Sequence, residues 1–116
     1  MEQLPYVLDQ SHRGAVLEAI REVCAHRQWS LLAAHVRTSH AHVVVEAQEK
    51  PEKAMNAFKS YASRRLNRIS AEGPGRKRWA RHGSTHWLFT REDVVAAIRY
   101  VVDGQGEAMA VFVAEA

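Results

Sequence analysis

Two short apolar runs near the middle of the chain, with a polar turn between them, constrain its fold more than any other feature. Residues 30–36 and residues 40–47 each have the length of a strand, and Thr38 and Ser39 lie in the gap between them. Strand-length runs on either side of a short polar turn are typical of an antiparallel β-hairpin. The sequence therefore predicts a hairpin over the two runs, with its turn at Thr38 and Ser39.

Helical patterns flank the hairpin on both sides. Before it, apolar side chains recur at helical spacing over residues 16–24, with Ser11 as the expected N-cap and a helix end near Arg27. After it, Pro51 suits the first turn of a helix whose apolar stripe extends over residues 55–69. These patterns place one helix directly before the hairpin and a second directly after it.

A third helix and weaker strand signals complete the pattern. Thr90 and Asp93 have the spacing of a capping box at the start of the last helix, and Gly104 is expected to end it. Short strands are expected at residues 4–8, where Pro5 favours a sheet edge, and at roughly residues 84–88. Residues 109–113 are expected to form a short final strand or an extended tail.

The order of these elements predicts the fold class. Strand, helix, strand, strand, helix, strand and helix in sequence match the ferredoxin-like split βαβ arrangement, which is an α+β fold. We expect a mainly antiparallel sheet with helices on one face and an additional C-terminal helix. The other face of the sheet is expected to stay available for a ligand or a partner.

The composition is typical of one globular domain. The chain has 116 residues, of which 47% are apolar and 25% are charged. Cys24 is the only cysteine, so no disulfide can form within the chain and a reducing compartment fits. No apolar run approaches the length of a membrane span, and the N-terminus lacks the pattern of a signal peptide. We therefore expect a cytoplasmic protein without a membrane association.

Positive charge is concentrated in one part of the chain. Between Lys59 and His82 there is a single acid, Glu72, whereas the remainder of the chain is near neutral or net acidic. A local basic block indicates a polyanionic partner, and a solvated surface without a partner is the alternative. The basic residues of the block are Lys59, Arg64, Arg65, Arg68, Arg76, Lys77, Arg78 and Arg81.

Two histidines one residue apart begin the second strand of the hairpin. Side chains alternate between the faces of a strand, so His40 and His42 share a face with Val44, while the face of Val43 is the better core face. Two neighbouring imidazoles are half of a metal site. Because Glu46 lies too far along the strand from His40, a third ligand is expected from another element.

A tyrosine and a glutamine near the end of the last helix are further candidates. Tyr100 lies about 200° around the helix from Ile98, which places it off the apolar stripe. Its ring either packs at the sheet edge or presents a reactive phenol. Gln105 follows five residues on, just past Gly104, and an amide oxygen is a good neutral ligand for a hard cation.

Taken in order along the chain, these features resemble the single-tyrosine HUH transposases. Residues 36–45 resemble the HUH motif (histidine, hydrophobic residue, histidine) of that family, which includes insertion-sequence and REP-associated tyrosine transposases. Residues 51–67 are similar to the helix that follows the motif, and residues 97–106 are similar to the nucleophile helix. The resemblance covers about residues 8–105. It implies a single HUH transposase-like domain over residues 1–116, with a first strand shortened as in a truncated copy.

The resemblance implies a metal-dependent endonuclease and strand transferase acting on single-stranded DNA. In such an enzyme Tyr100 attacks a DNA phosphate to form a 5′-phosphotyrosine intermediate, and His40, His42 and Gln105 hold Mg²⁺ or Mn²⁺. The implied partners are single-stranded or hairpin DNA and a second copy of the chain in a homodimer. The spacing from Tyr100 to Gln105 is five residues where the family has four, and Gly104 offers a turn that brings them together.

Several alternatives stay open at this point. A non-catalytic nucleic-acid-binding module, such as a degenerate or domesticated transposase that acts as a regulator, would use the same basic face. Nicking of the replication-initiator or relaxase kind is another possibility, against which the small size argues. Tyr61, in the basic helix, is a rival nucleophile. Trp79 and Trp87 are candidate stacking platforms for unpaired bases, with core packing as the alternative for each.

Overall fold

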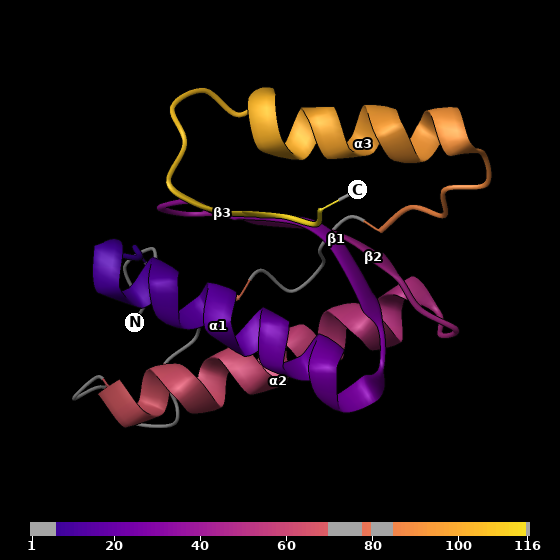
Figure 1. The fold of residues 1–116 in the computed structure, drawn as a ribbon. Helices are drawn as coiled ribbons and strands as arrows, with labels where there is room; N and C mark the ends of the chain where they lie inside the picture. The colour runs from indigo at the N-terminus through magenta and orange to yellow at the C-terminus, as the bar shows by residue number, and fades with distance from the viewer. Residues whose placement is uncertain (1–6, 70–77, 80–84, 116) are drawn as a thin grey trace.

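The chain folds into three helices and one three-stranded sheet. The computed structural model describes residues 7–69, 78–79 and 85–115. The strands pair in the order β2-β1-β3, and both pairings are antiparallel (Figure 1). The predicted α+β class and the predicted hairpin are confirmed, and the arrangement is compatible with a split βαβ fold. The elements in order are α1 (Gln10–Arg27), β1 (Ser30–Val36), β2 (Ala41–Glu46), α2 (Pro51–Ile69), α3 (Arg91–Asp103) and β3 (Ala110–Val113).

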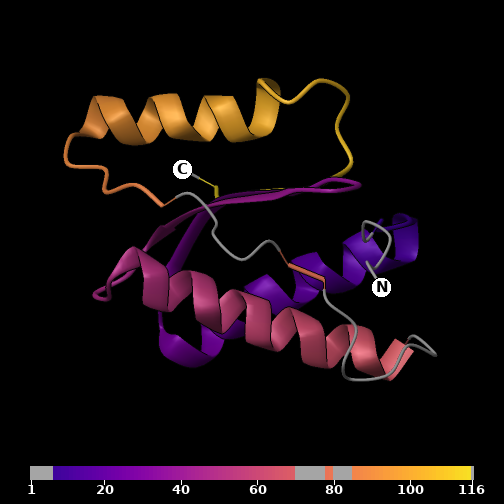
Figure 2. The same ribbon diagram turned by 180° about the vertical axis from the view of Figure 1, so that it is seen from behind.

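The sheet lies between two helical layers. Helix α1 packs on β1 and β3, and α2 packs against α1 on the same side of the sheet. Helix α3 contacts all three strands from the opposite side. Figures 1 and 2 show this arrangement from two opposite directions. The C-terminal helix therefore covers the face of the sheet that was expected to stay available.

Each face of the sheet has its own apolar core. The larger core joins α1, α2 and the face of the sheet that α1 covers, and Val36 and Leu66 are fully buried in it. The smaller core joins α3 to the other face through Val101 and Val44. Val43 packs against the larger core and its neighbour Val44 belongs to the smaller one. The face of Val43 contacts the larger core, as expected, but the face of Val44 is covered as well, because α3 supplies a second apolar surface.

Two helix starts show how local sequence sets the element bounds. The Thr90 hydroxyl accepts a hydrogen bond from the Asp93 backbone N–H at 3.0 Å, as the capping-box spacing predicts. At α1 the cap is Asp9 rather than Ser11, because the Asp9 carboxylate accepts from the His12 N–H at 2.9 Å. Ser11 lies in the first turn and donates its hydroxyl to the same carboxylate.

The weaker strand predictions have mixed outcomes. The final strand is confirmed as β3. Residues 85–88 form neither strand nor helix, so the strand expected there is wrong, and residue 84 lies outside the described residues. Residues 4–6 also lie outside them, and the described end of that segment, residues 7–8, is not a strand. Leu8 is nevertheless buried, and its N–H donates to the Thr38 carbonyl at 2.8 Å.

None of the helices in the described parts of the chain is both long enough and apolar enough to cross a bilayer.

Acidification is expected to weaken the start of α1 through Asp9. Hydrogen bonds from the His12 backbone N–H, the His12 ring and the Ser11 hydroxyl lower the pKa of Asp9 from 3.8 to about 2. A carboxyl group with a lowered pKa stabilises the fold above its unfolded value, and this contribution is lost as the pH falls through the folded value. Thermal unfolding of the wild type and of Asp9→Asn between about pH 5 and pH 2 measures it. The advantage of the wild type should shrink towards pH 2, and a constant difference would contradict the assignment.

Candidate functional site

Three aromatic rings from two elements meet on the α3 side of the sheet. The His40 and His42 rings, both on the hairpin, stack at 6.3 Å between centroids with an interplanar angle of 13°. The Tyr100 ring from α3 meets the His42 ring edge-on at 6.2 Å and 85°. A single chain therefore brings the predicted nucleophile beside the predicted metal-binding histidines, although they are far apart in sequence.

Helix α3 presents Tyr100 at its margin. The apolar stripe of the helix, with Val101 at its most buried point, packs on Ala33 and Val44. Tyr100 is one residue before Val101 and therefore about 100° away from it around the helix. Its side chain is 60% exposed. The predicted position off the stripe is confirmed, and the phenol is open to a ligand in solution.

A buried histidine that the sequence analysis left without a role anchors this helix. His35 is fully buried and is the cross-strand partner of His42. Its Nε2 accepts the Met109 backbone N–H at 3.0 Å, so Nδ1 carries the proton and donates to the Val101 carbonyl at 3.0 Å. His35 thus ties β1 to the last turn of α3 and to the segment before β3.

The hairpin register contains the signal that points to His35. A two-residue turn at Thr38 and Ser39 pairs each residue before the turn with one after it, and places His35 opposite His42. Directly opposed side chains lie on the same face of a sheet. A histidine facing the candidate metal-binding pair could therefore have been singled out from the sequence.

The Gln105 side chain contacts the backbone of Tyr100. Its side-chain N–H donates to the Tyr100 carbonyl at 3.1 Å, which leaves the amide oxygen able to accept another group. The chain turns at Gly104 to bring Gln105 close to Tyr100. A glycine is needed there, because a Cβ at that position would lie 2.8 Å from the Tyr100 carbonyl oxygen. The loop beyond is held by Arg37, which donates to the Glu107 carbonyl at 2.8 Å.

The surroundings of His42 favour its neutral form. Partial burial lowers the pKa of His42, and the nearby His40, His35 and Arg37 lower it further. A neutral imidazole is the form that binds metal ions. The Ser39 hydroxyl lies 2.9 Å from Nδ1 of His40, a contact that fixes one nitrogen and leaves Nε2 for another partner.

The described residues limit which side chains can bind a metal ion together with His40 and His42. In the parts of the chain that the structure describes, no three His, Cys, Asp or Glu side chains come together in a metal-binding group. Among the described residues, a third protein ligand beside His40 and His42 would therefore be another kind of donor, such as the amide oxygen of Gln105. Two imidazole nitrogens and one amide oxygen suit Mn²⁺, and also Mg²⁺ when further oxygens complete the shell.

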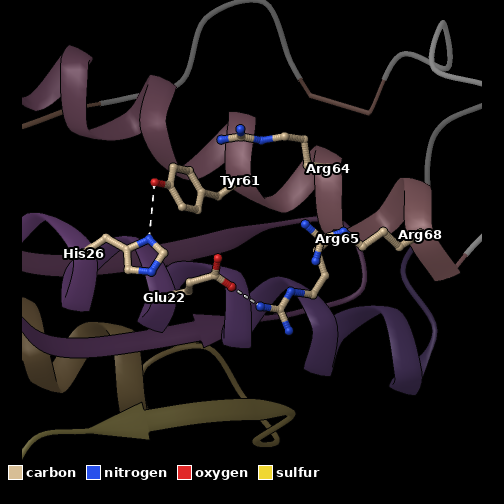
Figure 3. Close-up of a pocket in the computed structure, with 6 residues that line it drawn as sticks. All are labelled: Glu22, His26, Tyr61, Arg64, Arg65 and Arg68. Carbon is tan, nitrogen blue, oxygen red and sulfur yellow. Dashed lines mark hydrogen bonds and ion pairs between the residues drawn. The ribbon is translucent and has the colours of Figure 1, made fainter.

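Three arginines of α2 line a separate cavity on the other side of the sheet (Figure 3). It has a volume of about 210 Å³ and lies between α1 and α2. Arg65 forms an ion pair with Glu22 of α1, and the Arg64 guanidinium lies over the Tyr61 ring at 4.6 Å. Arg65 thus joins the two helices in addition to facing the cavity. Tyr61, the rival nucleophile, lies here and not beside the histidine pair. The lining residues are Glu22, His26, Tyr61, Arg64, Arg65 and Arg68.

The remaining basic candidates fall into two groups. Lys59 is half-buried on α2, and Arg78 donates to the Ser63 carbonyl at 3.5 Å. Arg76, Lys77 and Arg81 lie outside the residues that the structure describes.

The two tryptophans proposed as stacking platforms differ in their environment. Trp79 packs against the larger core, and its indole N–H donates to the Ser63 hydroxyl at 2.7 Å. Trp87 is 58% exposed. Core packing therefore holds for Trp79, whereas Trp87 is open to solvent.

Comparison with known proteins identifies the family. Residues 5–92 match the family model described as Transposase IS200 like. The match includes the histidine pair and ends one residue after α3 begins, so Tyr100 and Gln105 lie beyond it. Searches of curated proteins and of solved structures gave no match. Since the matched segment covers about three quarters of the chain, the protein belongs to the IS200-like transposase family, whose members process DNA.

Proposed function

We propose that the protein is a metal-dependent endonuclease and strand transferase for single-stranded DNA, with Tyr100 as its nucleophile. The observation that carries the proposal is the contact between the Tyr100 ring and the His42 ring, beside the stacked His40 ring. Membership of a transposase family supports DNA as the substrate. His40, His42 and Gln105 would hold Mg²⁺ or Mn²⁺.

The proposed reaction is a transesterification at phosphorus. The Tyr100 phenol oxygen attacks a phosphate of the strand, so a tyrosine O–P bond forms while the bond from phosphorus to the 3′ oxygen breaks. The phenol proton goes to solvent, and the leaving 3′ oxygen takes a proton from solvent. When bound, the divalent ion neutralises charge on the scissile phosphate. The products are a 5′-phosphotyrosine and a free 3′-hydroxyl.

The same site supports rejoining. A 3′-hydroxyl that attacks the phosphotyrosine restores a phosphodiester and returns Tyr100 to its phenol form. One ester bond is exchanged for another, so no nucleotide hydrolysis is required. The chain's own contribution is to fix geometry: α3 holds Tyr100, and the hairpin holds the two imidazoles.

We propose that the basic residues contact the phosphates of single-stranded or hairpin DNA. We also propose that the protein binds this DNA as a homodimer. Arg64 and Arg68 on α2 are exposed, which supports this role. The ion pair of Arg65 with Glu22 reduces the charge that this side chain can offer to DNA. Phosphate contacts of this kind make the affinity fall steeply with salt. The full proposed set is Lys59, Arg64, Arg65, Arg68, Arg76, Lys77, Arg78 and Arg81.

The central test compares two tyrosine variants. A labelled hairpin with single-stranded flanks is incubated with Mn²⁺ and the wild type, Tyr100→Phe or Tyr61→Phe, and covalent adducts are separated under denaturing conditions. We expect an adduct with the wild type and with Tyr61→Phe, and none with Tyr100→Phe or after chelation of the metal. An adduct that persists in Tyr100→Phe would refute the assignment.

A non-catalytic DNA-binding module is the second candidate function. Helix α2, with Arg64 and Arg68, lies on the opposite side of the sheet from α3, which carries Tyr100 (Figure 1). This position favours the second candidate, because DNA bound by these arginines need not reach Tyr100. DNA binding that is insensitive to a chelator, together with no adduct and no thermal stabilisation by Mn²⁺, would support this function over the first.

A further inference from the structure

Two aromatic side chains project side by side from the segment before α3. Trp87 is 58% exposed and Phe89 is 83% exposed. Their rings are nearly parallel, with an interplanar angle of 20° and 6.4 Å between centroids. Exposed apolar side chains that lie together as a patch mark interaction sites, whereas single exposed ones do not.

The separation of the two rings approaches that needed for one inserted base. Stacked bases repeat at roughly 3.4 Å along a strand, so a base held between two rings needs about 6.8 Å between them. The observed 6.4 Å is close to this spacing. Because the centroid distance is the upper limit of the gap between the ring planes, the two side chains must move apart to take one flat aromatic group between them.

Two arginines lie on one face of α3, the helix that begins two residues after Phe89. Arg91 and Arg99 line a hollow on the outer surface of the helix together with Val95, Ala96 and Glu92. Arg91 is two residues after Phe89, and Arg99 is next to Tyr100. Apolar rings followed by guanidinium groups complement a single strand of nucleic acid, whose bases are flat and whose backbone is anionic.

We propose that Trp87 and Phe89 clamp one unpaired base of single-stranded DNA, while Arg91 and Arg99 bind neighbouring phosphates. The clamp itself needs only DNA binding, and its relation to the cleaved bond rests on the proposed function of Tyr100. Arg91 and Tyr100 are nine positions apart on α3, which is about 14 Å at 1.5 Å per residue. That length corresponds to roughly four stacked nucleotides between the phosphate bound by Arg91 and the scissile phosphate.

Binding to matched strands with and without bases tests the clamp. The probes are a thymidine strand of about ten nucleotides and an abasic strand of equal length, titrated at several salt concentrations with chelator present. All proteins carry Tyr100→Phe and no metal ion is available, and the assay reads binding alone, so its result does not depend on the proposed chemistry. Trp87→Leu combined with Phe89→Leu removes the rings, and Leu88→Ala in the same segment is the control.

The proposal predicts a loss of base preference and not a loss of phosphate contact. The parent should prefer the thymidine strand over the abasic strand by roughly 5- to 150-fold, the range for stacking of one base. The double variant should lose most of this preference while the dependence of its affinity on salt stays unchanged. Leu88→Ala should behave as the parent, and Phe89→Tyr should retain the preference.

Three outcomes would overturn the clamp. They are equal affinity of the parent for both strands, an unchanged preference in the double variant, and an equal loss of preference in Leu88→Ala. Because the adduct assay in Mn²⁺ is separate, the clamp can hold while cleavage fails, and the reverse result is equally visible.

Discussion

Replacing His35 with leucine is expected to cause one of the largest losses of stability that a single substitution can produce in this chain. The change leaves the Met109 N–H and the Val101 carbonyl without the partners that His35 supplies at 3.0 Å each. The hydrogen bond to the Val101 carbonyl is buried, and a buried polar group without a partner costs about 1–3 kcal/mol, so we expect a loss of about that size in the free energy of unfolding.

Urea unfolding of His35→Leu measures this loss, and His86→Leu is the matched control. His86 is exposed, and substitutions at exposed positions usually change stability by less than about 0.5 kcal/mol. The Met109 amide should also exchange its hydrogen faster in His35→Leu than in the wild type. Equal stability of the two variants would show that His35 does not anchor α3.

Loss of the His35 hydrogen bonds should also lower activity at the functional site. His35 holds the Val101 carbonyl, and Tyr100 precedes that residue in the last turn of α3. A looser turn places the phenol less exactly beside His42, so we expect less adduct even at a temperature where His35→Leu stays folded.

Exchanging glycine for alanine is expected to have opposite effects in two helices. At Gly104 the added Cβ would lie 2.8 Å from the Tyr100 carbonyl oxygen and 3.2 Å from its Cα. Both atoms belong to the backbone, so the end of α3 must shift, at a cost of about 1–3 kcal/mol. At Gly14, inside α1, the added Cβ meets no atom within 4 Å. There alanine should stabilise the helix by about 0.5–1 kcal/mol.

Unfolding midpoints of Gly104→Ala and Gly14→Ala, measured side by side, give the two signs directly. Gly104→Ala should also lower the yield of adduct, because the shift displaces Tyr100, whereas Gly14→Ala should leave the yield unchanged. A neutral or stabilising effect of Gly104→Ala would mean that the C-terminal turn of α3 adapts without strain.

Local patterns were sufficient to predict the helices and the hairpin. The bounds of β1 were predicted correctly because an apolar run, a polar turn and a second apolar run leave little freedom in register. The last helix was predicted from its capping residue and its terminal glycine, both of which act within one turn. Such signals depend on neighbours in sequence and survive without knowledge of the tertiary structure.

The features that were missed depend on contacts between distant segments. The strand expected around residue 86 was predicted wrongly. A local sequence signal cannot tell whether another strand is available to pair with the segment. Ile69 was assigned to the core stripe of α2 and is 50% exposed, because the last turn of α2 extends past the core. Trp79 and Trp87 could not be told apart for the same reason, since only the packing of α2 decides which of them is covered.

The candidate site was predictable in part. Spacing along one strand placed His40 and His42 together, and helical geometry placed Tyr100 off the apolar stripe. The approach of the tyrosine to its own chain's histidines was not predictable, because it depends on α3 crossing the sheet above β2. The second core, built from Val44 and Val101, sets that crossing.

The layered arrangement has a consequence for the length of nucleic acid that the protein can engage. Helix α2, which carries Arg64 and Arg68, lies beyond one face of the sheet, and α3, which carries Tyr100, lies beyond the other (Figure 1). A straight oligonucleotide cannot touch both, since the folded chain stands between them. If both sets of residues bind one strand as proposed, that strand must curve around the rim of the domain, so a short oligonucleotide would contact only one of the two faces.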